Sequence, residues 1–231
     1  MRYKEIHEGI FIERPNRFIA HVLVDGKEEI AHVKNTGRCK ELLVPKALVY
    51  LEKSDNPKRK TKWSLISVKK RDRLINIDSQ APNKVVEEAI NSGTIKLTGI
   101  SEDNFLLRRE KNFGSSRFDF YFESDDRKGF IEVKGVTLEA DGVVRFPDAP
   151  TQRGTKHLTE LTEAVKEGYL SYIIFVVQMK DVKYFEPNYK TDPLFGNTLK
   201  KANASGVNIM AFDCIVDEDS MYVADEVKVK I

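Results

Sequence analysis

Three ionisable side chains near the middle of the chain have the types and the spacing that metal-dependent phosphodiester chemistry requires. Asp119 lies in the run Ser116-Arg117-Phe118-Asp119-Phe120-Tyr121-Phe122-Glu123, and Glu132 and Lys134 lie in Gly129-Phe130-Ile131-Glu132-Val133-Lys134-Gly135. Both runs alternate large apolar residues with polar ones, which predicts two β-strands joined by a short turn. Two carboxylates and an ammonium on one face of such a hairpin could hold a divalent cation and orient a water molecule beside it.

The register of this hairpin decides whether the three groups meet. If residues 124–129 form the turn, Glu123 faces Phe130, Tyr121 faces Glu132 and Asp119 faces Lys134. The remaining large residues would then point into a core, namely Phe118, Phe120, Phe122, Ile131 and Val133. A slip of one residue would separate the polar set, because side chains alternate with a period of two. The structural alternative is a solvated hairpin face, since strands often pair Lys with Glu.

The pattern Asp-X12-Glu-X-Lys on adjacent strands resembles the PD-(D/E)XK nuclease superfamily, with Phe118 in place of the usual proline. Four ordered motifs resemble, more specifically, the sugar fermentation stimulation protein A (SfsA) family over essentially the whole chain. They are Asn35-Thr36-Gly37-Arg38, Ser116-Arg117-Phe118-Asp119, Ile131-Glu132-Val133-Lys134 and Phe146-Pro147-Asp148-Ala149-Pro150-Thr151-Gln152-Arg153-Gly154-Thr155-Lys156-His157. The resemblance implies an OB-fold domain followed by a nuclease-like domain, and a DNA-binding protein.

The order of the runs predicts two domains. Strands are expected at 18–24, 28–33, 48–52 and 64–70, with a short helical piece at 40–43. About five strands in roughly seventy basic and aromatic residues suit an all-β, OB-fold-like barrel. Ser79-Gln80-Ala81-Pro82 marks the junction, which gives a nucleic-acid-binding domain at 1–82 and a nuclease-like domain at 83–231.

The second domain is predicted to be an α/β, PD-(D/E)XK nuclease-like mixed sheet flanked by helices. Its expected helices are 83–91, 151–167 and 194–205, and its expected strands are 106–110, 116–123, 129–135, 172–179, 207–215 and 222–229. Asn83 is expected to cap the first helix. On that helix Glu87 and Glu88 flank the apolar stripe symmetrically, so periodicity does not choose a third acid; the family resemblance favours Glu88.

The charge distribution points to nucleic acid as a partner. Residues 1–80 hold 18 Lys and Arg against 11 Asp and Glu, whereas the other 151 residues hold 20 against 25. Most of the excess lies between Lys53 and Arg73, where a phosphate backbone and stacked bases could bind. We expect DNA contacts from Lys58, Arg59, Lys60 and Trp63. A solvated, Lys-rich loop is the structural alternative.

Further contacts are expected from the other motifs. Arg38, in a tight polar loop, is either a phosphate contact or part of a simple turn. Arg153 and Lys156 open the 151–167 helix, whose N-terminus attracts anions. His157 could contact phosphate or act as a general acid, although a lone histidine is more often structural.

These residues predict hydrolysis of a phosphodiester bond in DNA. Mg²⁺ or Mn²⁺ would be bound by Asp119, Glu132 and the carbonyl of Val133 or Glu88, because oxygen ligands suit these cations, and Lys134 would orient the attacking water or help to deprotonate it. The sequence leaves open whether the DNA is single- or double-stranded and whether the protein forms a homodimer. The family resemblance also implies an alternative, a non-catalytic DNA-binding regulator of sugar (maltose) metabolism genes that would use the nuclease fold as a platform.

Other classes of protein are disfavoured by the composition. The sequence has no run of 18 apolar residues and no apolar signal segment, so we expect a cytoplasmic protein without membrane contact. Cys39 and Cys214 lack the spacing of a zinc site and are expected to be reduced thiols. The single Trp and the absence of an aromatic pair for sugar stacking give little support to direct sugar binding.

Overall fold

A computed structural model of the chain describes residues 1–35, 37–101, 104–125 and 127–231. Its first third is a closed five-stranded barrel with OB-fold strand order, as predicted. The barrel joins the strands in the order β3-β2-β1-β4-β5, and a parallel pairing of β3 with β5 closes it. The strands are β1 (Ile6–Asn16), β2 (Ile19–Val24), β3 (Lys27–Val33), β4 (Leu48–Lys53) and β5 (Trp63–Lys70), and β6 (Arg73–Asn76) pairs antiparallel with β5.

Two details of the barrel differ from the expectation. Strand β1 was not among the expected strands, because Gly9 and Pro15 interrupt its apolar pattern. Residues 40–43 form turns rather than a helix, and the carbonyl of Cys39 accepts from the N–H groups of Leu42 and Leu43 at 3.1 and 2.9 Å. Both cysteines are buried and unpaired, and burial raises the pKa of the Cys39 thiol to about 11.

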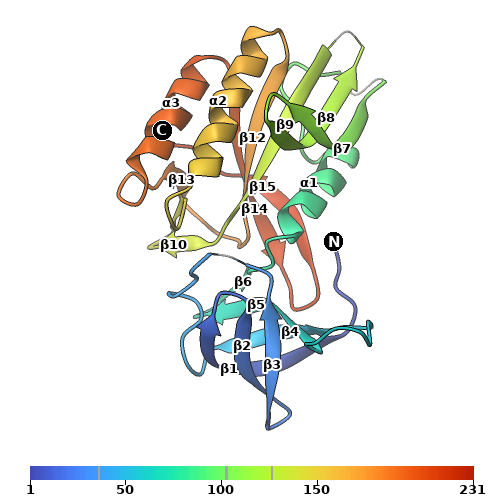
Figure 1. Cartoon of the computed structure of the whole chain (residues 1–231), viewed down its shortest axis with the longest axis vertical. Helices are drawn as coiled ribbons and strands as arrows, with labels where there is room; N and C mark the ends of the chain where they lie inside the picture. Colours follow the sequence, from blue (N-terminus) through green and yellow to red (C-terminus); the bar gives the residue numbers. More distant parts are fainter. Residues whose placement is uncertain (36, 102–103, 126) are drawn as a thin grey trace.

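The second domain is a six-stranded mixed sheet between helices (Figure 1). The strand order is β15-β14-β12-β9-β8-β7, in which β12 runs parallel to β9 and β14. The strands are β7 (Leu106–Phe113), β8 (Ser116–Ser124), β9 (Arg127–Val136), β12 (Leu170–Val177), β14 (Asn208–Val216) and β15 (Met221–Glu226). This confirms the predicted mixed sheet and its element order.

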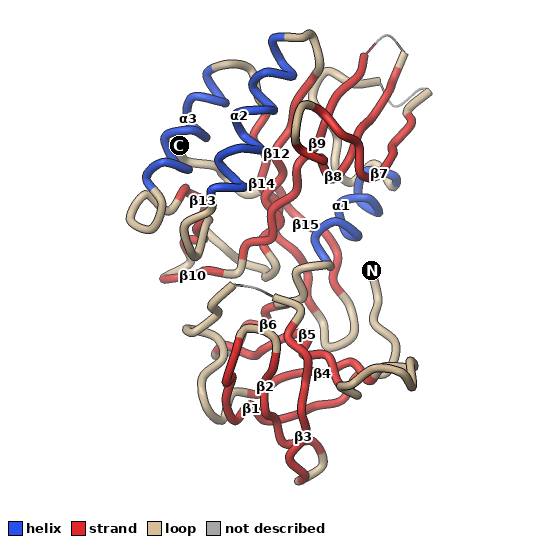
Figure 2. Tube along the Cα trace, viewed as in Figure 1, coloured by secondary structure: helices blue, strands red, loops and turns tan. Residues whose placement is uncertain are grey.

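Within the described part of the chain, three helices cover the two faces of this sheet. Helix α1 (Ala81–Asn91) lies on one face, and α2 (Gln152–Lys166) and α3 (Pro193–Ala204) lie on the other (Figure 2). Strand β12 alternates between the two cores: Tyr172 and Ile174 pack on the α1 side, and Ile173 and Phe175 on the α2 side. A strand buried on both faces must be apolar throughout, which explains its uninterrupted hydrophobic run.

A small three-stranded sheet was not expected from the sequence. It contains β10 (Leu138–Ala140), β11 (Val143–Phe146) and β13 (Tyr184–Pro187). Strands of three or four residues are too short to show a periodicity, so the hydrophobic pattern does not predict them. The β10–β11 hairpin carries Glu139, whose carboxylate accepts a hydrogen bond from Lys70 of the barrel at 2.7 Å.

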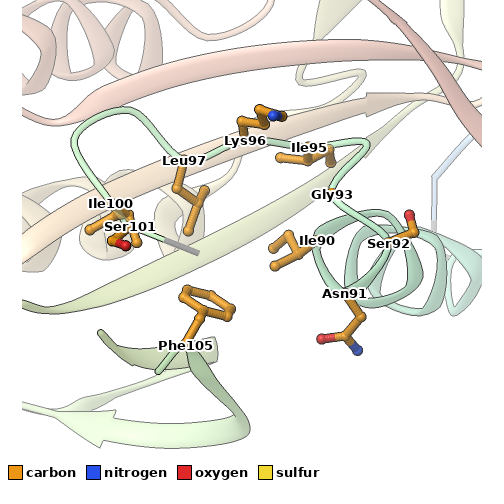
Figure 3. Close-up of a pocket in the computed structure, with 10 residues that line it drawn as sticks. All are labelled: Ile90, Asn91, Ser92, Gly93, Ile95, Lys96, Leu97, Ile100, Ser101 and Phe105. Atoms are coloured by element: carbon orange, nitrogen blue, oxygen red, sulfur yellow. The ribbon is translucent and has the colours of Figure 1, made fainter. Parts of the chain in front are cut away.

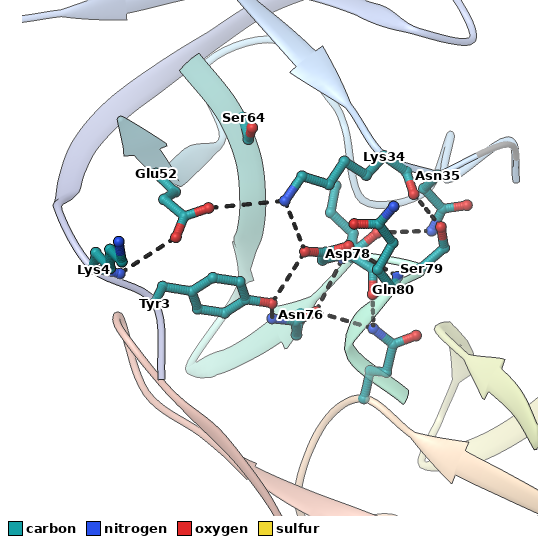
Figure 4. A network of polar contacts seen from close by, with 12 residues as sticks. Tyr3, Lys4, Lys34, Asn35, Glu52, Ser64, Asn76, Asp78, Ser79 and Gln80 are labelled. Atoms are coloured by element: carbon teal, nitrogen blue, oxygen red, sulfur yellow. Dashed lines mark hydrogen bonds and ion pairs between the residues drawn. The ribbon is translucent and has the colours of Figure 1, made fainter. Parts of the chain in front are cut away.

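The barrel and the second domain share a buried polar network (Figure 4). Asn76 donates to the hydroxyl of Tyr3 at 2.9 Å, and Gln178, which follows β12, donates to Asn76 Oδ1 at 3.0 Å. Gln178 also donates to the carbonyl of Asp78, whose carboxylate accepts from Lys34 Nζ at 3.2 Å. These contacts join the C-terminal end of β12 to β6 and to the segment that leads into α1.

Helix α1 begins earlier than predicted. Its first residue is Ala81, with Pro82 in the first turn, where a missing N–H costs nothing. Asn83 is therefore not the N-cap, and its side chain is free for another contact. Strand β6 ends at Asn76, and the proposed division at 82/83 stays a prediction. Across the described residues, no helix is long and apolar enough to span a bilayer.

Candidate active site

The β8–β9 hairpin brings Asp119 and Glu132 together in a register two residues away from the predicted one. The structure pairs Phe120 with Ile131 and Tyr121 with Phe130, whereas the predicted register set Tyr121 opposite Glu132. The turn is shorter than expected, since β8 ends at Ser124 and β9 begins at Arg127; residue 126 lies outside the described residues. A shift of two leaves the side chains of the paired residues 120–124 and 127–131 on their expected faces, because side chains alternate with a period of two.

Asp119 lies where the two strands separate. The β8–β9 pairing stops at Phe120 and Ile131. Beyond it, a side chain replaces the main-chain partner: Asp119 Oδ2 accepts from the N–H of Val133 at 2.8 Å. Oδ1 accepts from the side-chain amide of Asn83 on α1, also at 2.8 Å. Both carboxylate oxygens are thus held in place by one strand and one helix.

The same irregularity changes the position of Phe118. The residue was expected in one core with Phe120, but it packs in the α2-side core, with its ring centroid 5.4 Å from that of Phe130 and 5.7 Å from that of His157. Alternation breaks at Asp119 because the strand departs from a regular ladder there.

Glu132 lies in the middle of β9 with only 2% of its surface exposed. Its Oε1 accepts a hydrogen bond from Lys134 Nζ, and His157 Nδ1 lies 2.5 Å from the same oxygen. Its Oε2 is buried and has no hydrogen-bond partner among the described residues. Since an unsatisfied buried carboxylate oxygen is costly, this atom marks a position where a ligand is expected.

Helix α2 supplies the histidine because its start is fixed. Thr151 caps the helix by accepting from the N–H of Gly154 at 3.0 Å, and Arg153 and His157 then lie one turn apart. The Nε–H of Arg153 donates to His157 Nε2 at 3.3 Å. An Arg N–H is always a donor, so Nε2 carries the lone pair and Nδ1–H donates to Glu132.

The two carboxylates are placed in different electrostatic surroundings. Burial, followed by the negative charge of Glu132, raises the pKa of Asp119 above its ordinary value. Burial also acts to raise the pKa of Glu132, but the hydrogen bond from His157 and the charge of Lys134 outweigh it, so the pKa of Glu132 lies below its ordinary value. The pair therefore has one carboxylate that is firmly ionised and one that would gain from a nearby cation.

The expected third acid does not lie at this site. Glu88 accepts from the amino group of Met1 at 2.6 Å, and Glu87 pairs with Arg109 on β7. Within the described ranges, no group of three His, Cys, Asp or Glu side chains is placed to hold a metal ion. Helix α1 contributes Asn83 instead. The available signal was a polar residue in the first turn of a helix next to the hairpin, but Asn83 was assigned as the helix cap.

The residues that were expected to contact DNA differ in their exposure. His157 is 4% exposed and both ring nitrogens are engaged, so it is not a phosphate contact. Arg153 and Lys156 are exposed, and Lys156 Nζ donates to the carbonyl of Ser115 at 3.0 Å. The side chain of Arg38 is exposed, and its main-chain N–H donates to Asp148 at 2.9 Å. Thr36, in the same motif, lies outside the described residues.

The basic β4–β5 loop also differs from the expectation. Trp63 is 3% exposed and belongs to the barrel core, so it offers no surface for base stacking. Arg59 is half-buried and donates to Ser64 at 3.0 Å and to Thr61 at 3.3 Å. Lys58 and Lys60 are exposed, with no ion pair to any described residue.

A separate pocket of about 410 Å³, with a mixed polar and apolar lining, lies beyond the C-terminal end of α1. Ile90, Leu97 and Phe105 line it (Figure 3). None of the three groups of the β8–β9 hairpin lines this pocket, so it is distinct from the candidate active site.

Comparison with known proteins identifies the family of this chain. The family model "Sugar fermentation stimulation protein RE domain" matches residues 80–220, and the model "SfsA N-terminal OB domain" matches residues 12–77. The chain belongs to the SfsA family. A sugar fermentation stimulation protein homolog from Clostridium beijerinckii is 59% identical over 229 residues, which cover 99% of both chains. A homolog from Ruminiclostridium cellulolyticum is 55% identical over the full length of both.

A solved structure of another SfsA protein has the same fold. The structure of Pyrococcus furiosus SfsA in complex with Ca²⁺ superimposes with a TM-score of 0.89 and 28% identity, covering 100% of this chain and 98% of that one. The barrel and the mixed sheet are thus the architecture of an SfsA protein.

Proposed function

We propose that this SfsA protein hydrolyses phosphodiester bonds in DNA, with Mg²⁺ or Mn²⁺ bound between Asp119 and Glu132. The observation that carries the proposal is the unpartnered Glu132 Oε2, which is buried beside a second carboxylate. Two carboxylates so close together repel each other unless a cation lies between them. A purely structural pair would be expected to have each oxygen satisfied.

The donor set fits a hard cation. Asp119 and Glu132 offer carboxylate oxygens, and the Val133 carbonyl is the proposed third ligand from the chain. Mg²⁺ commonly keeps several waters and takes only one or two carboxylates, so a third acid is not required. The P. furiosus SfsA structure is a complex with Ca²⁺, a cation that also prefers oxygen ligands.

The chain's own residues would divide the remaining work. The bound cation would supply charge neutralisation of the phosphate and a lower pKa for the attacking water. Asn83 and the Val133 N–H hold Asp119, while His157 and Lys134 hold Glu132. Lys134, with 16% of its side chain exposed, is near enough to the surface to orient a water or a phosphate oxygen.

Exposed cations would bind the DNA backbone around this site. Arg153 and Lys156 lie in the first two turns of α2, beside the helix N-terminus that attracts anions. Arg38, Lys58 and Lys60 would add contacts from the barrel. Such contacts would make affinity salt-dependent without carrying sequence information.

The alternative is a DNA-binding regulator of sugar metabolism that does not cut DNA. The names of the relatives refer to the stimulation of sugar fermentation, which favours this alternative. The ionised Glu132 weighs against it, because a carboxylate near a phosphate weakens DNA binding unless a cation intervenes.

Incubation of supercoiled plasmid and of labelled single-stranded DNA with Mg²⁺, Mn²⁺ or EDTA tests the proposal. Cleavage with either cation and none with EDTA is expected. DNA binding without cleavage under every cation condition would favour the regulator.

A further inference from the structure

A groove on the barrel combines an apolar floor with a cationic rim. It has a volume of about 560 Å³ and runs over β1 and the segment after β3. Ile12, Leu43 and Val44 contribute to its floor, and Arg17, Arg38 and Lys40 to its rim. Among the described residues that line it, Glu13 is the only acidic one. The side chains of the three rim cations are exposed and form no ion pair with any described residue.

One half-buried arginine builds the wall of this groove. The guanidinium of Arg14 donates to four main-chain carbonyls, those of Arg17, Asn35, Gly37 and Arg38, at 2.6 to 2.9 Å. These bonds tie the β1–β2 turn to the loop that carries Arg38. Cations on a preordered backbone lose less conformational entropy when they bind a charged ligand.

The groove leads toward the candidate active site. Gly37 lines both this groove and a pocket of about 170 Å³ between the domains, and that pocket reaches Gly135, the residue after Lys134. The N–H of Arg38 is bound by Asp148, three residues before the N-cap of α2. A chain that crosses this groove would therefore continue toward the β8–β9 hairpin.

An exposed aromatic ring lies beside the rim. Phe18, in the β1–β2 turn, is 50% exposed, and the guanidinium carbon of Arg17 lies 5.6 Å from the centre of its ring. The β1–β2 loop is one of the loops that OB-folds use for oligonucleotides. A stacking ring next to unpaired cations is the combination that binds single-stranded nucleic acid, whose bases are free to stack.

We propose that this groove binds a single-stranded segment of nucleic acid, with Arg17, Arg38 and Lys40 on its phosphates and a base stacked on Phe18. The assignment rests on the proposed function, which supplies the nucleic acid as substrate. It replaces the predicted stacking role of Trp63, and it selects single-stranded nucleic acid over duplex at this surface. The β4–β5 loop projects on the opposite side of the barrel (Figure 1) and contributes charge only.

The test measures binding in EDTA, so that no catalysis is involved. The probes are a fluorescein-labelled oligothymidylate of about 15 nucleotides, which matches the span of an OB-fold, and a DNA hairpin duplex of equal length. Phe18→Ala is expected to weaken binding of the oligothymidylate about tenfold while the duplex affinity stays unchanged. Phe18→Trp is expected to retain wild-type binding. Unchanged melting temperatures show that both variants fold.

A charge-matched pair of variants completes the test. Arg38→Ala/Lys40→Ala is expected to weaken oligothymidylate binding and to reduce its salt dependence by about 1.4 log units per log unit of salt, since each single-strand contact contributes about 0.7. Lys58→Ala/Lys60→Ala removes the same charge across the barrel and is expected to affect both probes in equal proportion. The proposal is overturned if Phe18→Ala binds the oligothymidylate as wild type does, or if both double variants change the ratio of the two affinities equally. Cleavage of the same probes with Mn²⁺, measured separately, reports on the proposed function alone.

Discussion

His157 Nδ1 lies 2.5 Å from Glu132 Oε1, and both side chains are almost completely buried. Because Arg153 donates to the other ring nitrogen, the imidazole is held from both sides. The contact engages one oxygen of Glu132 and leaves the other for a ligand. We infer that His157 is a positioning residue, which orients a metal ligand in the way that outer-shell partners do in metal sites.

Replacement of His157 by Asn or by Gln should separate the contributions of its two ring nitrogens. The amide nitrogen of Asn lies at the position of Nδ1, whereas that of Gln reaches the position of Nε2. We expect His157→Asn to bind Mn²⁺ within a few-fold of wild type and His157→Gln to lose about 10- to 100-fold in affinity, measured by calorimetric titration. Equal affinities for the two variants would contradict a positioning role.

Asn83 and Glu88 offer a direct comparison on one helix. Asn83 donates to Asp119, whereas Glu88 binds Met1. Asn83→Ala should lower the rate of Mn²⁺-dependent cleavage, since Asp119 loses the bond that orients Oδ1. Glu88→Gln should leave this rate unchanged. Loss of cleavage in Glu88→Gln, with an unchanged melting temperature, would restore Glu88 as the third acid.

The stabilising effect of Mn²⁺ should depend on pH. In the cation-free protein the raised pKa of Asp119 means that the folded state keeps a proton that the unfolded state has lost, from the ordinary value of 3.8 upward. In that window the free energy of unfolding falls as pH rises, and a cation that binds the ionised carboxylate offsets the loss. The rise in melting temperature caused by Mn²⁺ should therefore grow with pH.

The size of this effect follows from mass action, at about 2.7 kcal/mol for a hundredfold excess over Kd. Asp119→Asn should remove both the Mn²⁺ response and its pH dependence. An equal Mn²⁺ response in Asp119→Asn and wild type would show that the cation stabilises the protein elsewhere.

Gly135 should not tolerate a side chain. A Cβ atom there would lie 2.5 Å from Gln178 Oε1 and 2.9 Å from Pro82 Cγ. Since Gln178 is fixed by bonds to Asn76 and Asp78, the clash cannot be relieved by a free rotation. Gly135→Ala should reduce the free energy of unfolding by about 1–3 kcal/mol, measured by urea denaturation. A wild-type midpoint would mean that the domain interface is more adaptable than the contacts indicate.

The sequence predicted much of the fold because its long elements carry strong periodic signals. The apolar run of β12 and the stripe of α2 were placed to within two residues. The three-residue strand β10 has no such signal. The hairpin register was wrong by two because turn length, rather than hydrophobic pattern, sets it.

The candidate site was predicted in part for a related reason. Asp119, Glu132 and Lys134 are identified by local spacing. The Glu132–His157 contact joins residues 25 positions apart, and the Asn83–Asp119 contact joins residues 36 apart, so only the tertiary fold shows them. Trp63 was predicted to stack on bases and Glu88 to lie at the metal site. Composition and helical period do not show which face of a strand or helix packs against other parts of the protein.

A catalytic cation site at Asp119 and Glu132 is tested most directly by the cleavage rate of labelled DNA. Wild type and Asp119→Asn are purified in parallel and assayed with Mn²⁺. We expect Asp119→Asn to cleave no faster than an EDTA control, while its DNA affinity in EDTA equals or slightly exceeds that of wild type, because a negative charge near the phosphate is gone. Cleavage by Asp119→Asn at the wild-type rate would contradict a catalytic role for this pair of carboxylates.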